Sequence, residues 1–244
     1  MPTELKDKVA VVTGGSRGIG YSIAEALLAE GAKVFICGRD ASVLESELAR
    51  LASAAKERVD GRVADMRRYE DCRRVVHTAA KRFGGLDVLV NNAGVGIFKP
   101  VDQLTPEEWD SIIETNLSGV FYCCREAIPL MRQRGGGYIF NISSLAGVNA
   151  FAGGSAYNAS KFGLNGFSEA MMQDVRYDGI RVSYIMPGSV DTEFNRAPQF
   201  RSPESGWKLT GEDIAKAVVD LYKFPKTALA SRIEMRPSQP PRKK

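Results

Sequence analysis

The sequence predicts an α/β fold in which helices cover both faces of a seven-stranded parallel sheet. Two observations support this prediction. Short apolar runs alternate with segments whose apolar residues recur at helical spacing, and this succession builds parallel sheets through right-handed crossovers. In addition, no linker, repeat or low-complexity stretch interrupts the 244 residues, a length that one α/β domain can fill. We therefore expect residues 1–244 to form a single domain.

Seven runs have the apolar, β-branched character of buried strands. They are Val9–Val12, Lys33–Cys37, Val59–Ala64, Val88–Val90, Tyr138–Ile142, Val182–Ile185 and, with weaker character, Arg232–Met235. Helix signals lie between them. Thr105–Glu108 supplies an N-cap, a proline at the first helical position and a capping box, and Thr210–Asp213 opens another helix that ends near Phe224. Asp40 is placed to cap the helix after the second strand.

A glycine-rich turn follows the first predicted strand. Residues 13–20 are Thr-Gly-Gly-Ser-Arg-Gly-Ile-Gly, and the helical run after them stops near Gly31. Strand, glycine-rich turn and helix form the dinucleotide fingerprint of a doubly wound, Rossmann-type domain. We expect Gly14, Gly18 and Gly20 to let the backbone approach a pyrophosphate, whose charge the N–H groups at the helix start would bind. A plain structural turn is the alternative.

Ligands of a doubly wound sheet bind beyond the carboxyl ends of its strands. Polar motifs follow each of the first six predicted strands directly. These motifs are Thr13–Gly20, Gly38-Arg39, Asp65, Asn91–Gly94, Ser143-Ser144 and Pro187-Gly188. Scattered polar residues would not align in this way, so we expect the motifs to share one site.

Tyr157 and Lys161 are four residues apart and therefore lie on the same face of a helix. A cation beside a tyrosine favours the phenolate and brings its pKa from about 10 towards neutral pH, which suits acid–base chemistry on a carbonyl group. Ser144 adds a hydroxyl group that could act on the oxygen of the same carbonyl group. An ordinary helix pair is the alternative when this motif is taken alone.

Composition and charge exclude several classes of protein. A net charge of +4 with 44% hydrophobic residues indicates a soluble globular protein with too little basic excess for nucleic-acid binding. No apolar run approaches the ~20 residues that span a bilayer, and the charged N-terminus does not resemble a signal peptide, so we expect a cytoplasmic protein. Four cysteines without metal or redox spacing and the lone His77 predict no metal site.

Together these motifs resemble the short-chain dehydrogenase/reductase family in its common form, above all NADP-dependent carbonyl reductases and 3-oxoacyl-[acyl-carrier-protein] reductases. The resemblance runs from about Lys8 to Arg236 and includes Thr115-Asn116-Leu117. It implies a catalytic tetrad of Asn116, Ser144, Tyr157 and Lys161. The family's usual thirteen-residue gap before the tyrosine selects Ser144 over Ser143.

The resemblance also implies roles. Ser144 would polarise the substrate carbonyl and Tyr157 would exchange a proton with its oxygen. Lys161 would lower the tyrosine pKa and bind the nicotinamide ribose, and Asn116 would hold a water molecule that links this lysine to solvent. The implied reaction is hydride transfer between a nicotinamide cofactor and the carbonyl carbon.

The charge after the second predicted strand selects the cofactor. A carboxylate there would accept the ribose hydroxyls of NAD, but this chain has Gly38 followed by Arg39. Arg17 in the glycine-rich turn supplies a second cation, and two guanidinium groups can bind a 2′-phosphate through forked contacts. We therefore expect NADP(H), with reduction as the cellular direction. A solvated turn is the alternative for Arg39.

Further cofactor contacts are implied by the resemblance. Asp65 should meet the adenine amino group, and Val190 and Thr192 should hold the carboxamide, although Thr192 could instead cap a short helix. The other residues assigned in this way are Ser16, Ile19, Met66, Asn92, Gly94, Pro187 and Gly188.

The substrate is less defined than the cofactor. Residues 194–209 replace the longer lid of many relatives, and we expect them to be mobile. An apolar, open pocket would have as its walls Val95, Gly96, Ile97, Leu145, Phe151 and Trp207. Such a pocket favours a hydrophobic ketone or aldehyde, or a 3-oxoacyl thioester. An acidic acyl carrier protein could bind Arg132, Arg134 and Arg176, for which solvated side chains are the alternative.

Assembly and two other functions complete the expectations. The family pairs the helices at Glu107–Met131 and Ser155–Tyr177 across a two-fold axis, which implies a homotetramer or a homodimer. The basic tail at about 237–244 is interpreted as a solvated end. Two other functions remain alternatives to a reductase: a regulator that binds NADP without turnover, and a lyase or isomerase on the same scaffold. The presence of both Tyr157 and Lys161 counts against each.

Overall fold

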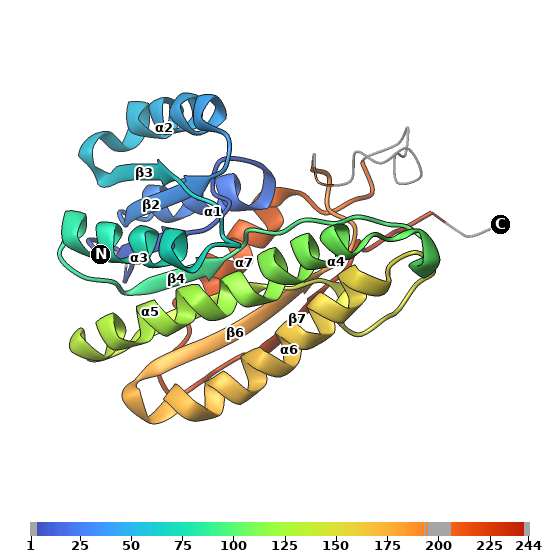
Figure 1. Cartoon of the computed structure of the whole chain (residues 1–244). Coiled ribbons are helices and arrows are strands. Elements are labelled where there is room, and N and C mark those ends of the chain that lie inside the picture. The colour runs from blue at the N-terminus through green and yellow to red at the C-terminus, as the bar shows by residue number, and fades with distance from the viewer. Residues whose placement is uncertain (1–3, 193, 195–205, 242–244) are drawn as a thin grey trace.

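One parallel sheet of seven strands forms the centre of the molecule in the computed structural model, which describes residues 4–192, 194 and 206–241 (Figure 1). The strands are β1 (Val9–Val12), β2 (Lys33–Gly38), β3 (Val59–Val63), β4 (Val88–Asn91), β5 (Gly137–Ile142), β6 (Ile180–Pro187) and β7 (Arg232–Met235). Their order is β3-β2-β1-β4-β5-β6-β7. The order changes direction between β1 and β4, which is where such sheets bind ligands. The predicted doubly wound fold is confirmed.

Helices cover both faces of the sheet (Figure 1). The first face carries α1 (Gly18–Ala29), α2 (Ala41–Ala55) and α7 (Gly211–Tyr222). The second face carries α3 (Tyr69–Phe83), α5 (Gly119–Gln133) and α6 (Ser155–Val175), with α4 (Pro106–Ile113) beside α6. Short 3₁₀ turns are η1 (Lys56–Arg58), η2 (Val101–Gln103), η4 (Leu145–Gly147) and η5 (Arg176–Asp178).

The buried strands explain why two hydrophobic cores form. In β1 the side chains of Ala10 and Val12 enter the core beneath α1 and α7, whereas those of Val9 and Val11 enter the core beneath α3 and α5. Successive strand residues point to opposite faces, so a continuous apolar run buries both. These continuous apolar runs are the feature by which the strands could be predicted from the sequence.

The predicted helix caps are confirmed. Thr105 accepts a hydrogen bond from the backbone of Glu108, whose side chain returns one to the Thr105 backbone, and Thr210 and Asp213 form the same reciprocal pair. The Asp40 side chain accepts from the backbone N–H of Val43 and begins α2. No helix within the described residues combines the length and the apolarity needed to cross a membrane.

The helix expected at Glu107–Met131 is interrupted, and that prediction was wrong in its continuity. A π-helical turn, η3 (Glu114–Ser118), separates α4 from α5. A π turn widens the helix by one residue and is common at functional sites. Here it carries Asn116, whose side chain bonds to a neighbouring loop in place of facing solvent.

Candidate active site

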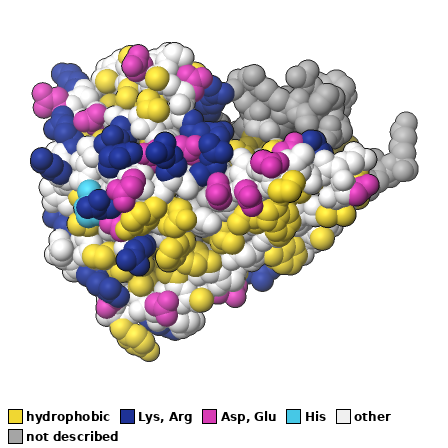
Figure 2. Space-filling model, in the orientation of Figure 1, with side chains coloured by type: hydrophobic (Ala, Val, Ile, Leu, Met, Phe, Trp, Pro, Cys, Tyr) yellow, Lys and Arg dark blue, Asp and Glu magenta, His cyan; other side chains and the backbone are white. Residues whose placement is uncertain are grey.

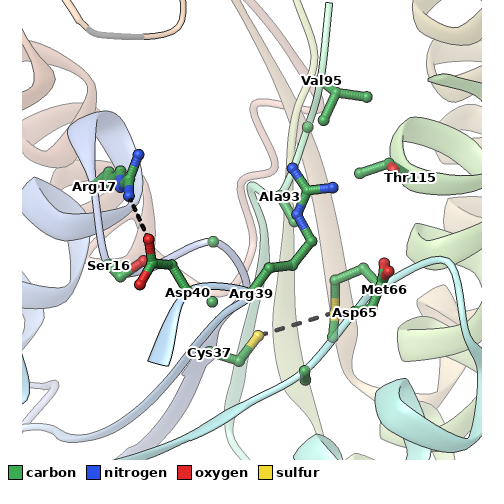
Figure 3. A pocket seen from close by; sticks show the side chains of 14 residues that line it. Ser16, Arg17, Cys37, Arg39, Asp40, Asp65, Met66, Ala93, Val95 and Thr115 are labelled. Carbon is green, nitrogen blue, oxygen red and sulfur yellow. Dashed lines mark hydrogen bonds and ion pairs between the residues drawn. The ribbon is translucent and has the colours of Figure 1, made fainter. Parts of the chain in front are cut away.

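A cleft of about 360 Å³ lies at the carboxyl ends of β1 to β4 (Figure 3). Its lining residues are Gly14, Ser16, Arg17, Cys37, Gly38, Arg39, Asp40, Ala64, Asp65, Met66, Ala93, Gly94, Val95 and Thr115. Loops that follow four different strands therefore meet here, as the rule for doubly wound sheets requires. Most of the residues that were predicted to hold the adenosine half of a dinucleotide come together in this cleft.

The glycine-rich turn has the backbone shape that only glycine adopts easily. Gly14 and Gly18 have φ angles of +62° and +49°. A Cβ atom at Gly20 would lie 2.3 Å from the Gly14 carbonyl oxygen, so a side chain cannot be accommodated there. Neither a side-chain cap at Arg17 nor an acidic residue in the first turn of α1 competes with an anion at this helix start. The turn therefore fits a phosphate group.

Two polar side chains attach this turn to β4. The Asn92 amide donates to the carbonyl oxygens of Thr13 and Gly14 at 3.0 and 3.1 Å. In return, the Thr13 hydroxyl accepts from the backbone N–H groups of Asn92 and Ala93, both at 3.0 Å. Asn92, which was expected to contact the cofactor, thus has its amide engaged in holding the turn. Thr13 was not singled out beforehand as a positioning residue.

Charged groups lie on both walls of the cleft. Figure 3 shows the Arg39 side chain extending across it toward Ala93. On the other wall, the Arg17 guanidinium pairs with the Asp40 carboxylate, with 3.2 Å between Nη2 and Oδ2. Gly38 leaves room beside them for the Ser16 side chain, which would have to move if a Cβ atom were present, because that atom would lie 2.5 Å from the Ser16 hydroxyl oxygen.

The floor of the cleft contains Asp65 and Met66. The Arg67 side chain donates to the Asp65 carboxylate through Nε at 2.9 Å and Nη2 at 2.5 Å, and this pairing lowers the pKa of Asp65. The carboxylate that was expected to meet an adenine amino group therefore already has a cationic partner. Met66 lies beneath, with its Sδ 4.0 Å from the Cys37 Sγ.

Thr115 is a lining residue that the sequence did not indicate. Its side chain is 6% exposed, and its Oγ1 is buried without a hydrogen-bond partner in the described structure. A buried hydroxyl without a partner is costly, so such a group beside a cleft is a candidate for contact with a ligand. Its only sequence signal was its place directly before Asn116.

Tyr157, Ser144 and Lys161 come together at the end of β5 and the first turns of α6. Tyr157 is 8% exposed, and the Ser144 side chain lies near enough to its hydroxyl to lower the tyrosine pKa. The Lys161 ammonium donates to the Ile142 carbonyl oxygen at 2.9 Å and lies 5.7 Å from the centre of the tyrosine ring. The three side chains predicted to act on a carbonyl are therefore neighbours.

Burial controls the protonation of the tyrosine and the lysine. It raises the pKa of Tyr157 to about 12, while the Ser144 side chain acts in the opposite direction. It lowers the pKa of Lys161 to about 8. The tyrosine pKa is therefore not brought towards neutral, as was expected, because the cost of dehydrating a phenolate dominates. Tyr157 is held as the neutral phenol, the form that donates a proton.

Asn116 connects the loop that lines the cleft to α6, the helix that carries Tyr157 and Lys161. Its Oδ1 accepts from the Val95 backbone N–H at 2.8 Å, and its Nδ2 donates to the Val95 carbonyl oxygen at 2.9 Å. The same Nδ2 lies 3.0 Å from the Ser160 hydroxyl oxygen. The side chain that was expected to hold a water molecule thus bonds directly to protein groups on both sides.

Two further asparagines of α6 hold the segment that carries Ser144, and the sequence analysis missed both. Asn158 donates to the carbonyl oxygens of Ala146 and Asn149 at 2.6 and 3.0 Å. Asn165 donates to the Gly147 carbonyl oxygen at 3.0 Å and accepts from the Ser143 hydroxyl at 2.6 Å. Ser143 is a structural neighbour of the site, as expected. The seven-residue spacing of the two asparagines, two turns of one helix face, was the available signal.

The chain matches the family model for short chain dehydrogenases over residues 8–200. The protein belongs to the short-chain dehydrogenase family. An uncharacterized oxidoreductase of Staphylococcus saprophyticus is 33% identical, over 96% of this chain and 99% of its own. A metagenomic short-chain oxidoreductase solved with NADP has a TM-score of 0.83 at 35% identity, and covers 96% of this chain and 99% of its own.

Two other solved structures are similar. The alcohol dehydrogenase of the archaeon Thermococcus sibiricus, complexed with 5-hydroxy-NADP, has a TM-score of 0.87 at 30% identity, over 97% of this chain and 99% of its own. A variant of the actinorhodin polyketide ketoreductase with NADPH has a TM-score of 0.88 at 31% identity, over 97% of this chain and 98% of its own. The short-chain dehydrogenase fold therefore extends over nearly the whole chain.

Aromatic rings surround the tyrosine of this short-chain dehydrogenase. The ring centre of Phe98 lies 5.4 Å from that of Tyr157 in an edge-to-face arrangement, and that of Phe194 lies 6.0 Å away. Phe98 also contacts Phe151, with 5.8 Å between ring centres. Phe151 was predicted as a pocket wall, whereas Phe98 was missed.

The remaining predicted cofactor residues follow β6. Val190 is buried, and the Gly188 backbone N–H, directly after Pro187, donates to Met235 at 2.7 Å. A Cβ atom at Gly18 would lie 3.3 Å from the Thr192 side chain, so the loop after β6 reaches the glycine-rich turn beside Ile19. Of the expected lid at 194–209, residues 195–205 lie outside the described residues, as do 242–244 of the tail.

Proposed function

We propose that this short-chain dehydrogenase is an NADP(H)-dependent reductase that converts a ketone, an aldehyde or a 3-oxoacyl thioester reversibly to the alcohol. The observation that carries the proposal is the grouping of Tyr157, Ser144 and Lys161, in which the serine acts on the tyrosine pKa and the lysine ammonium lies 5.7 Å from the centre of the tyrosine ring. Three similar structures were solved with NADP, an NADP derivative or NADPH, which supports the choice of cofactor. The four cysteines are free and buried, which suits the reducing cytoplasm.

The described residues fit this cofactor. The first turn of α1 and the glycine-rich turn would bind the pyrophosphate, and Arg17 and Arg39 would bind the 2′-phosphate of the adenosine. Thr115 offers an unpaired hydroxyl to the same half of the cofactor. When bound, NADPH would supply the hydride that reduces the carbonyl carbon.

The proton would come from the Tyr157 hydroxyl. As a neutral phenol with its pKa raised to about 12, it donates to the carbonyl oxygen on which charge develops. The Ser144 hydroxyl would orient and polarise that oxygen. Lys161, with its pKa lowered to about 8, is mostly charged at neutral pH and stabilises the tyrosine oxygen after the proton has left.

The outer face of α4, α5 and α6 supports assembly into a homodimer or homotetramer. Trp109, Phe121 and Phe162 are 39%, 44% and 47% exposed. Figure 2 shows hydrophobic side chains gathered over these helices. Large apolar side chains that are exposed together usually contact a partner, and a second copy of the chain is the partner that we propose.

The test is NADPH oxidation with a panel of ketones, aldehydes and 3-oxoacyl thioesters, with NADH in parallel. We expect turnover with NADPH, loss of turnover in Tyr157→Phe with NADPH binding retained, and a shift towards NADH in Arg39→Asp. Full activity of the phenylalanine variant would disprove the proton-transfer role. Binding of NADPH without turnover on any carbonyl compound would favour the regulator, and elimination or isomerisation without NADPH consumption would favour the lyase or isomerase.

A further inference from the structure

The ion pair between Arg17 and Asp40 lies in the wall of the cofactor cleft. Both residues line the cleft, and their side chains are about half exposed, at 52% and 51%. In Figure 3 the two side chains face each other from the glycine-rich turn and from the residue that follows Arg39. A carboxylate therefore lies among the groups proposed to bind a 2′-phosphate.

The two oxygens of Asp40 have separate partners. Oδ1 accepts from the Val43 backbone N–H at 3.2 Å and from the Ser42 hydroxyl at 2.9 Å, and this contact caps α2. Oδ2 accepts from the Arg17 guanidinium at 3.2 Å. The hydrogen bonds at Oδ1 lower the pKa of Asp40, so the carboxylate is charged at neutral pH. The cap needs only one oxygen, and the negative charge is not required for it.

We infer that Asp40 competes with the 2′-phosphate for the Arg17 guanidinium and so limits the preference of the enzyme for NADP(H) over NAD(H). The inference rests on the proposed function, because it concerns the same adenosine site. A phosphate dianion that binds Arg17 must replace or share the carboxylate already there, and it also lies near a like charge. An adenosine without the 2′-phosphate neither displaces the Asp40 carboxylate from Arg17 nor places a negative charge beside it.

The opposite role is that Asp40 helps the phosphate by holding Arg17 in position. Asp40→Asn separates the two roles, because asparagine is as good an N-cap as aspartate but has no charge. The variant should keep the cap of α2 through its side-chain oxygen. If Asp40 competes, the variant binds a 2′-phosphate more tightly, and if it positions Arg17, the variant binds it more weakly.

Asp60→Asn is the matched control. Asp60 pairs with the Arg82 guanidinium at the same distance, 3.2 Å, with side chains 41% and 46% exposed. It does not line the cleft. The control therefore removes one carboxylate of a similar ion pair and changes the net charge equally, but leaves the cleft as it is.

The experiment is calorimetric titration of the wild type and both variants with adenosine 2′,5′-bisphosphate and with adenosine 5′-monophosphate. We expect Asp40→Asn to bind the bisphosphate about fivefold more tightly, as one charge at an exposed ion pair allows, and the monophosphate unchanged. Thermal midpoints should be equal. The selectivity of Asp60→Asn should match the wild type.

Three results would overturn the inference. Unchanged or weaker bisphosphate binding by Asp40→Asn would exclude competition by Asp40. Equal tightening in Asp60→Asn would show a general effect of net charge. If the wild type bound neither adenosine compound, the proposed cofactor site itself would fail, an outcome that differs from loss of the selectivity change alone.

Discussion

The Lys161 ammonium is anchored on the Ile142 carbonyl oxygen, 2.9 Å away, in a place where its side chain is almost wholly buried. Burial lowers the pKa of Lys161 from 10.5 to about 8. The folded protein therefore binds fewer protons than the unfolded chain between these two pH values. A charged lysine at this position destabilises the protein at neutral pH, which indicates that it is kept for a purpose other than folding.

Lys161→Met should stabilise the protein at pH 7 and abolish carbonyl reduction. The stabilisation should be at most about 3 kcal/mol, because a pKa shift of one unit corresponds to about 1.4 kcal/mol and the Ile142 carbonyl loses its donor. The free energy of unfolding of the wild type should rise between pH 8 and 10.5, which are the pKa values of Lys161 in the folded and unfolded chain. The difference in stability between the variant and the wild type should therefore shrink in this range. Urea unfolding at several pH values measures it. Lower stability of the variant at pH 7 would contradict this account.

Asn116→Ala should lower both stability and turnover. The substitution leaves the backbone N–H and carbonyl groups of Val95 without their partners at 2.8 and 2.9 Å, at a cost of about 1–3 kcal/mol for two part-buried groups. Because the same side chain connects Val95 to Ser160 of α6, the maximal rate should fall more than cofactor affinity. Denaturant unfolding and steady-state kinetics test this.

Asn149→Ala is the control for the asparagine variant. Asn149 is exposed and its amide makes one contact, to the Leu145 carbonyl oxygen at 3.2 Å. We expect a change in the free energy of unfolding below about 0.5 kcal/mol, which is typical of surface sites. Equal losses of unfolding free energy in the two variants would mean that the Asn116 hydrogen bonds contribute no more to stability than a surface contact does.

Thr115→Val should weaken cofactor binding without harming the fold. The valine has the shape of threonine but lacks the Oγ1 that is buried without a partner, so the free protein should be as stable or up to about 1 kcal/mol more stable. Loss of a hydrogen bond to the cofactor should raise the Kd for NADPH about fivefold. Fluorescence titration measures it, with Thr115→Ser as the variant that keeps the hydroxyl. Unchanged affinity in the valine variant would remove Thr115 from the binding site.

Phe162→Lys should reduce the oligomeric state. A lysine at this 47% exposed position of α6 places a charge in the proposed contact between copies. Light scattering after size-exclusion chromatography should show smaller particles than for the wild type. Tyr177→Lys is the control, because Tyr177 is 93% exposed and lies beyond the end of α6. A wild type that is monomeric, or a Phe162 variant with unchanged mass, would contradict the proposed interface.

Sequence reasoning located the fold well because parallel strands are buried on both faces. Val9–Val12 and Arg232–Met235 have the predicted bounds, and the other strands differ by a few residues at their ends. The caps at Thr105 and Asp40 were also predictable, since a cap depends on residues three positions apart. Local chemistry was sufficient for these features.

The parts that could not be predicted depend on contacts between distant segments. The π turn at Glu114–Ser118 carries Asn116 and its hydrogen bonds with Val95, and periodicity along one helix does not reveal such contacts. The raised pKa of Tyr157 comes from how completely the side chain is buried, which its spacing to Lys161 does not reveal. The motifs were sufficient to propose the site residues. They could not show which polar atoms of these residues are already hydrogen-bonded to other parts of the protein.

The strand order also has a consequence for synthesis on the ribosome. β1 emerges first but lies inside the sheet, with one edge on β2 and the other on β4. After β2 has formed, the second edge of β1 stays open until Val88–Asn91 leaves the exit tunnel. An unpaired edge on an apolar strand can pair with other chains, so we expect nascent or truncated products that stop before β4 to be prone to aggregation.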